Sequence, residues 1–304
     1  MRLAILHETT YDYRPAVETA HHVAHLRPLQ DPTQQLISHL LSLDPGPTDG
    51  QLSERIDAFG NTVTQWQLTQ VHQRLRVRAS SVVQTLTLPD AHDTAPWTSA
   101  RELLAYRSGQ ASRPEAAFVF ASHHAAPHAD FADYARPDFG PDAPLQAAAL
   151  ALSARMHREL RYESQSTDVH TPARQALRMR RGVCQDFAHI LLACLRSQGL
   201  AARYVSGYLL TQPPEGQARL IGSDASHAWV ALWVPGQAQH ASGGWLHLDP
   251  TNDRWGWGSP GEDYVQLASG RDFADVSPLR GVLQGGTSHH PVVAVTVTPQ
   301  DEPA

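Results

Sequence analysis

The chain has 304 residues, 41% of them hydrophobic and 18% charged, with a mass of 33.3 kDa and a mean hydropathy of -0.36. This length allows about two domains of ordinary size, and this composition excludes a mini-protein and an intrinsically disordered chain. The formal net charge of -6 leaves no surplus of cations for phosphates, so we expect neither nucleic acids nor anionic membranes as partners.

Two cysteines, Cys184 and Cys194, are too few for a disulfide framework. If one helix carries both, a rise of 1.5 Å per residue places them about 15 Å apart, so we expect free thiols, which suit a reducing compartment. The amino terminus has only four consecutive apolar residues, too few for a signal peptide. We therefore expect a cytoplasmic protein.

Residues 1–90 are predicted to form an antiparallel β domain similar to a sandwich. Apolar residues alternate with polar ones in this part, as at Thr64, Trp66 and Leu68, and turn-forming clusters separate the runs. Residues 91–144 are rich in Pro, Ala, His and Asp and are predicted to connect two domains, with one helix near residues 99–108.

Residues 145–304 are predicted to form a second domain of the α+β class. Apolar residues at helical spacing predict a helix from Leu145 to about Leu160. Two more helices are expected, one from Thr171 to about Gly182 and one from about Cys184 to Gly199. The period then falls to two, which predicts strands at residues 202–210, 226–234 and 244–248, and another at 291–298.

Cys184 stands where a nucleophilic cysteine is needed. It follows Arg180 and Arg181 and begins an apolar helix, so guanidinium groups and helix amides are both expected to stabilise a thiolate. The charge of Asp186 opposes this, so a base must help. Cys194 lies deeper on the apolar side and is expected to be a small core residue.

His227 and Asp249 supply the base and its partner. His227 begins the strand 226–234, and Asp249 ends the next predicted strand, so a hairpin would bring the imidazole and the carboxylate together. If the Cys184 helix packs on the face of the sheet that carries His227, the imidazole can accept the thiol proton while Asp249 orients the ring.

These segments resemble a known family. Gly182-Val183-Cys184-Gln185-Asp186, Ser226-His227-Ala228-Trp229 and Asp249-Pro250-Thr251-Asn252 look like the catalytic blocks of the bacterial transglutaminase-like superfamily, in the same chain order. The opening segment, with His7-Glu8-Thr9-Thr10-Tyr11 and Leu26-Arg27-Pro28, is similar to the β domain that precedes the catalytic domain in many bacterial members.

The resemblance implies a papain-like α+β core in which a helix carrying the cysteine packs on an antiparallel sheet. It implies Cys184 as nucleophile, His227 as base and Asp249 as its orienter, with no metal and no organic cofactor. The chemistry implied is acyl transfer from an amide through a thioester. The backbone N–H of Cys184 is the expected first oxyanion donor, and the side chains of Gln185 and Tyr162 are candidates for a second.

Two other readings compete for particular residues. The chain has 18 histidines, among them His21, His25, His124, His128 and the pair His289-His290, but their spacing does not form a metal motif and predicts solvated side chains. An aromatic cluster flanks Asp249 and is expected to serve core packing or to line the substrate cleft: Trp245, Trp255, Trp257 and Tyr264.

Three functions remain open at this point. We favour a cysteine hydrolase that cleaves peptide or isopeptide-like amides, because water is always available as acceptor. The same chemistry would serve an amine-accepting protein-glutamine transferase. The third possibility is a catalytically silent peptide-binding scaffold, which needs none of Cys184, His227 and Asp249. The expected partner in each case is a peptide or protein.

Overall fold

A long first strand, β1, organises the N-terminal sheet. The structure is a computed structural model that describes residues 1–47, 52–91, 94–109, 111–164, 166–168, 171–211, 226–236, 244–286 and 291–300. Side chains along the first part of β1 alternate between buried and partly exposed, as the period of two requires. The strands of this sheet are β1 (Arg2–Ala24), β2 (Gln34–Asp44), β3 (Leu52–Ile56), β4 (Thr62–Leu68), β5 (His72–Thr85), β13 (Leu279–Gly285) and β14 (Val292–Pro299).

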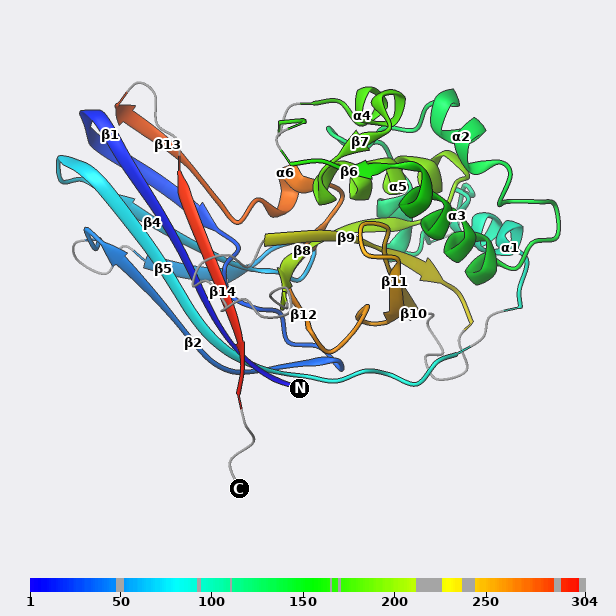
Figure 1. Ribbon diagram of the computed structural model, residues 1–304, viewed down its shortest axis with the longest axis horizontal. Helices are drawn as coiled ribbons and strands as arrows, with labels where there is room; N and C mark the ends of the chain where they lie inside the picture. Colours follow the sequence, from blue (N-terminus) through cyan, green and yellow to red (C-terminus); the bar gives the residue numbers. More distant parts are fainter. Residues whose placement is uncertain are drawn as a thin grey trace, which may run out of the picture.

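The last two strands return to the first sheet. The strand order is β2-β5-β1-β4-β3, and β13 and β14 also pair with β1, which gives one seven-stranded curled sheet (Figure 1). Leu3 lies opposite Pro299 in β14, and Ala24 lies opposite Leu279 in β13. The strand predicted near the end of the chain is thus confirmed, with β1 as its partner. The division into domains at residues 90 and 144 stays a prediction. In space, β13 and β14 lie with the strands of residues 1–90.

A second antiparallel sheet, the C-terminal sheet, has five strands in the order β11-β10-β9-β8-β12. The helices between residues 97 and 197 lie together beside it, away from the N-terminal sheet, and the short helix at residues 273–276 lies nearer to that sheet (Figure 1). This arrangement confirms the α+β class. Its strands are β8 (Ala202–Leu209), β9 (Ser226–Val234), β10 (Gly244–Asp249), β11 (Arg254–Trp257) and β12 (Tyr264–Gly270), and a separate parallel pair is formed by β6 (Arg161–Tyr162) and β7 (Arg181–Gly182).

The expected helices are present with small shifts in their ends. The helix predicted near residues 99–108 starts earlier and ends earlier, and the helices at residues 114–118, 129–135 and 273–276 were not predicted. The helices are α1 (Trp97–Leu104), η1 (Pro114–Phe118), α2 (Ala129–Ala135), α3 (Leu145–Glu159), α4 (Ala173–Met179), α5 (Cys184–Ser197) and α6 (Phe273–Val276). Within the described ranges, none of these helices has both the length and the apolar character needed to cross a membrane.

Helix α5 is the centre of the C-terminal core. Every residue from Asp186 to Arg196 is buried, because helices, strands β8 and β9, and the connecting segment surround it. Gly199 follows the helix with φ +78°, a conformation that glycine adopts without strain. Both cysteines are free thiols, as expected, and Cys194 is fully buried in this core.

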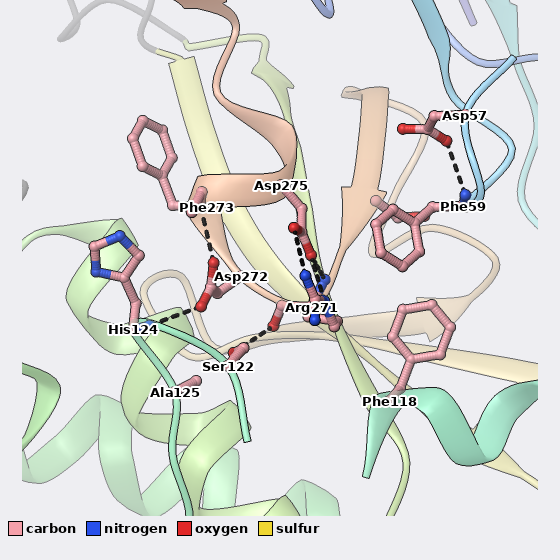
Figure 2. A network of polar contacts seen from close by, with 12 residues as sticks. Asp57, Phe59, Phe118, Ser122, His124, Ala125, Arg271, Asp272, Phe273 and Asp275 are labelled. Atoms are coloured by element: carbon pink, nitrogen blue, oxygen red, sulfur yellow. Dashed lines mark hydrogen bonds and ion pairs between the residues drawn. The ribbon is translucent and has the colours of Figure 1, made fainter. Parts of the chain in front are cut away.

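One buried arginine ties the connecting segment to this core. The Arg196 side chain is 2% exposed and donates hydrogen bonds to the carbonyl oxygens of four residues and to one hydroxyl. These acceptors are Phe118, Ala125, Ala202 and Arg271, and the hydroxyl of Ser122. Figure 2 shows the same junction, where the backbone N–H of His124 donates to Asp272 at 2.7 Å and Ser122 lies beside Arg271.

The two sheets are joined by side-chain amides that pair with backbone groups of β12. Gln34 donates to the carbonyl of Gln266 at 2.8 Å and accepts from its N–H at 2.7 Å. Asn61 makes the same two contacts with Ser269, at 2.9 and 2.8 Å. Because all of these groups are buried, each pair satisfies backbone atoms that would otherwise lack partners. The N-terminal sheet thereby fixes the position of β12.

Replacing Arg196 by methionine is expected to lower the free energy of unfolding by about 3 kcal/mol, because buried carbonyl oxygens lose their donor. Urea denaturation measures this change. Arg178→Met is the matched control: Arg178 pairs with Asp130 on the surface, and its loss should have little effect. Equal stability of the two variants would contradict the role given to Arg196.

Candidate active site

Cys184 is the first residue of α5, and the residues around it fix the start of that helix. The carboxylate of Asp186 accepts the backbone N–H of Val183 at 2.8 Å and the hydroxyl of Thr167 at 2.6 Å. A Cβ on Gly182 would lie 2.6 Å from this carboxylate, so the close approach requires glycine. Cys184 itself stays partly exposed.

The charges near Cys184 are arranged differently from the expectation. Arg180 pairs with Glu159 at 2.6 Å and Arg181 with Glu163 at 3.4 Å, so surface carboxylates largely neutralise both guanidinium groups. Asp186 caps the helix, and burial raises its pKa despite its hydrogen bonds to Thr167 and Val183. The helix start is therefore the main positive influence on the thiol.

His227 and Asp249 lie together, as the hairpin predicted. Nε2 of His227 is 2.7 Å from Oδ2 of Asp249, and the imidazole also forms a hydrogen bond with the side chain of Cys184. Since Nε2 faces the carboxylate, Nδ1 is left for the thiol. The three side chains thus stand in the order thiol, imidazole, carboxylate. His227 is 7% exposed and Asp249 is completely buried.

The pKa shifts of this pair follow from its contacts. Burial alone would lower the pKa of His227, but hydrogen bonds to Asp249 and Cys184 and the charges of both groups raise it to about 10. Burial alone would raise the pKa of Asp249, but the hydrogen bond and charge of His227, with bonds from Asn252 and Tyr264, hold it below its usual value. A protonated imidazole beside an ionised carboxylate is therefore the stable state of the pair near neutral pH.

Helix α5 packs on one face of the sheet, and His227 points to the other face, contrary to the expectation. Its apolar side chains share a core with Ala228, Val230 and Leu232 of β9, whereas His227 and Trp229 point to the other face. Contact with the thiol is still made, because His227 is the second residue of β9 and Cys184 the first of α5. The thiol and the imidazole therefore meet where the two elements begin, and not across the face of β9 that α5 covers.

Two further residues hold Asp249 and were not predicted in that role. The hydroxyl of Tyr264 in β12 donates to Oδ2 of Asp249 at 2.7 Å, and Nδ2 of Asn252 donates to the same oxygen at 2.7 Å. The backbone N–H of Thr251 donates to Oδ1 at 2.9 Å. Strand β12, which carries Tyr264, is separated from β10 by β9 and β8 in the sheet. The contact of Tyr264 with Asp249 therefore depends on the curl of the sheet and left no local signal in the sequence.

Tyr162 lies beside the thiol, in keeping with its candidacy as an oxyanion donor. Strand β6 pairs with β7 so that Tyr162 is opposite Gly182, two residues before Cys184. Burial and the nearby Cys184 raise the pKa of this half-exposed tyrosine, so its hydroxyl keeps its proton. Gln185, the other candidate, is partly buried in the first turn of α5.

The structure also bears on the histidines and on the aromatic cluster that the sequence singles out. Within the part of the chain that the structure describes, no three His, Cys, Asp or Glu side chains gather in a way that could hold a metal ion. His289 and His290 lie outside the described residues. Of the aromatic cluster, Tyr264 contacts Asp249, whereas Trp255 packs against the main core.

Comparison with known proteins places the chain in a family. Residues 133–250 match the transglutaminase-like superfamily, and residues 3–84 match the bacterial transglutaminase-like N-terminal region. An uncharacterised protein of Mycobacterium tuberculosis is 35% identical over 98% of this chain and 93% of its own length. The chain belongs to the transglutaminase-like superfamily.

Other relatives extend this result. An uncharacterised protein of Mycobacterium leprae is 31% identical over 98% of both chains. A protein-glutamine gamma-glutamyltransferase of Pseudomonas aeruginosa is 38% identical over 73 residues, which is 24% of this chain and 10% of that protein. The fold is similar to that of a Cytophaga hutchinsonii protein proposed to be a cysteine protease, with a TM-score of 0.71 and 20% identity over 100% of this chain and 92% of that one.

The stability that His227 contributes should depend on pH in a defined direction. Its pKa is about 10 in the folded protein and close to 6.5 when unfolded, so this stability is complete below pH 6.5 and is lost as the pH rises through 10. The difference in unfolding free energy between wild type and His227→Gln should therefore narrow from pH 6 to pH 10. Urea denaturation at several pH values measures it, and a widening difference would contradict the assignment.

Tyr264→Phe should lower the free energy of unfolding by about 2 kcal/mol, because a buried carboxylate loses a hydrogen-bond donor. Tyr134→Phe is the matched control, since its hydroxyl donates at 3.0 Å to Glu159, an exposed carboxylate. Chemical denaturation of both variants compares the two losses. A loss in Tyr134→Phe as large as in Tyr264→Phe would argue against a special role for the buried contact.

Proposed function

We propose that this protein is a cysteine enzyme that forms a thioester on Cys184 and hydrolyses amide bonds in peptides or proteins. The observation that carries the proposal is the hydrogen-bonded series from Cys184 through His227 to the buried Asp249. A scaffold that only binds peptides has no need of a buried carboxylate that orients a histidine toward a thiol.

The reaction follows from these positions. In the resting site the thiol proton already lies on His227, and the sulfur of Cys184 attacks the amide carbon as a thiolate. The carbon–nitrogen bond then breaks, and His227 returns the proton to the leaving amine, which leaves a thioester. Water attacks the thioester and gives a proton to His227, the carbon–sulfur bond breaks, and the carboxylic acid departs, which restores the thiolate and the protonated imidazole. Asp249 stays ionised throughout and holds the ring.

The negative oxygen of each tetrahedral intermediate needs donors that are already in place. The backbone N–H of Cys184 lies at the free amino end of α5, and we assign it as the first donor. Tyr162 is the candidate for the second, because it lies beside Cys184 and keeps its proton. On this assignment the leaving group departs on the side of His227.

Amine transfer is the second candidate function. It is favoured by the identity of 38% over 73 residues with a protein-glutamine gamma-glutamyltransferase. The same thioester would then react with a primary amine, and the amine would give its proton to His227. A glutamine-containing peptide distinguishes the two outcomes by mass spectrometry: cleavage or deamidation marks hydrolysis, and a mass increase that requires added cadaverine marks transfer.

The proposed setting of this reaction is the cytoplasm. Both thiols are free in the structure, and a cysteine nucleophile must stay reduced to act. The proposed partner is a peptide or protein that presents an amide to Cys184.

Alkylation by iodoacetamide tests the nucleophile without a known substrate. We expect Cys184 to react rapidly at pH 6 to 7, below the range of an ordinary thiol, and Cys194 to stay protected in the folded core. Peptide mass spectrometry reads each site separately. In His227→Gln the reaction of Cys184 should slow by at least tenfold at pH 6.5, because the proton acceptor is gone.

Turnover provides the second readout once an amide substrate is found. Cys184→Ala should abolish it, and Cys194→Ala should leave it largely unchanged. Full activity in Cys184→Ala, or a Cys184 that alkylates no faster than a free thiol, would refute the proposal.

A further inference from the structure

A cavity lies on the same sheet as the candidate active site but is lined by other residues. Its volume is about 190 Å³, and it forms where the segment between β1 and β2 meets β8, β10 and β11. Neither Cys184, His227 nor Asp249 lines it. The residues that matter for its chemistry are Asp31, Arg203, Trp245, His247 and Trp257.

Arg203 is the central feature of this cavity. Its guanidinium carbon lies 4.1 Å from the centre of the Trp245 ring, and its Nε is buried without a hydrogen-bond partner among the described residues. Arg196, in contrast, is buried with acceptors for all three of its nitrogens. Arg203 lines the cavity with no such acceptors among the described residues, so its guanidinium group keeps unused donors.

The buried position of Arg203 disfavours its charged form. Burial lowers the pKa of Arg203 to about 10, and nearby Asp31 opposes this change. No ion pair of Arg203 is found within the described ranges, so Asp31 balances its charge from a distance. A cationic group with unused donors in a partly enclosed cavity is a site for an anion.

His247 adds a neutral donor. The indole N–H of Trp229 donates to Nδ1 of His247 at 2.9 Å, so Nδ1 is unprotonated and Nε2 carries the hydrogen. Burial and the charge of Arg203 hold the pKa of His247 well below its usual value, so the ring stays neutral at physiological pH. The cavity therefore presents one positive charge and one neutral N–H.

The remaining walls select the kind of anion. Trp245 and Trp257 are aromatic and offer an apolar surface, and the volume is close to that of cavities that accept a molecule of benzene, about 150 Å³. The planar fork of a guanidinium matches a carboxylate. The negative charge of Asp31 disfavours a ligand that carries more than one negative charge. We propose that this cavity binds a small organic monocarboxylate, with its carboxylate on Arg203 and its apolar part against Trp245 and Trp257.

Butyrate is a suitable probe, because it is a monocarboxylate with a short apolar chain. Saturation-transfer NMR titration of the full-length protein should show butyrate binding, with butyramide and inorganic phosphate binding at least tenfold more weakly. The amide lacks the charge, and phosphate carries too much of it. Cys184→Ala should bind butyrate as the wild type does, which keeps this result separate from the proposed catalysis.

Two variants test the residues. Arg203→Gln should weaken butyrate binding at least tenfold, whereas Arg101→Gln, a matched change in an arginine that lies over Trp97 elsewhere, should leave it unchanged. Asp31→Asn should tighten binding roughly threefold, because it removes a negative charge while its Oδ1 still accepts the N–H of Thr33. This second variant tests the site even if Arg203→Gln fails to fold.

The proposal is overturned if wild type binds butyrate no better than butyramide. It is also overturned if a folded Arg203→Gln protein, checked by circular dichroism, binds butyrate like the wild type. Weaker butyrate binding by Asp31→Asn would contradict it as well, because the site would then need the negative charge.

Discussion

The buried carboxylate of Asp249 is the constraint on which the rest of the site depends. A charged group that water cannot reach is stable only if other groups supply the lost hydrogen bonds. Asp249 receives them from the ring of His227, the amide of Asn252 and the hydroxyl of Tyr264. Each donor comes from a different element or turn, so the carboxylate fixes β9, β10 and β12 relative to one another. Cys184 then needs only to reach the free side of one ring.

The N-terminal sheet contributes to this arrangement without contributing a residue of the triad. Strand β12, which carries Tyr264, is held on its outer edge by Gln34 of β2 and by Asn61 of the turn between β3 and β4. Amide side chains replace the neighbouring strand that β12 would otherwise need. The curl that brings Tyr264 to Asp249 is therefore supported from outside the C-terminal sheet. The N-terminal sheet thus helps to position the site through β12.

The extent to which the sequence predicted this structure depends on the range of each interaction. The helix that begins at Cys184, the strand that begins at His227 and the hairpin to Asp249 are set by local periodicity and turns, and the structure has them within a few residues. Tyr264 was placed only in an aromatic cluster, because its contact with Asp249 needs the curvature of a whole sheet. The side of the sheet on which α5 packs was also wrong in the prediction, since alternation along a strand shows two faces without saying which one a helix covers.

The pairing of the chain's ends within one sheet has a consequence for synthesis. Strand β1 is made before the C-terminal sheet, yet the residues that pair with one of its edges, in β13 and β14, are made after that sheet. While the ribosome adds the intervening domain, that edge of β1 keeps unpaired N–H and C=O groups that other chains could bind. The N-terminal sheet can therefore be completed only after the C-terminal sheet has left the ribosome, and the nascent protein passes through a stage at which its first strand needs protection from aggregation.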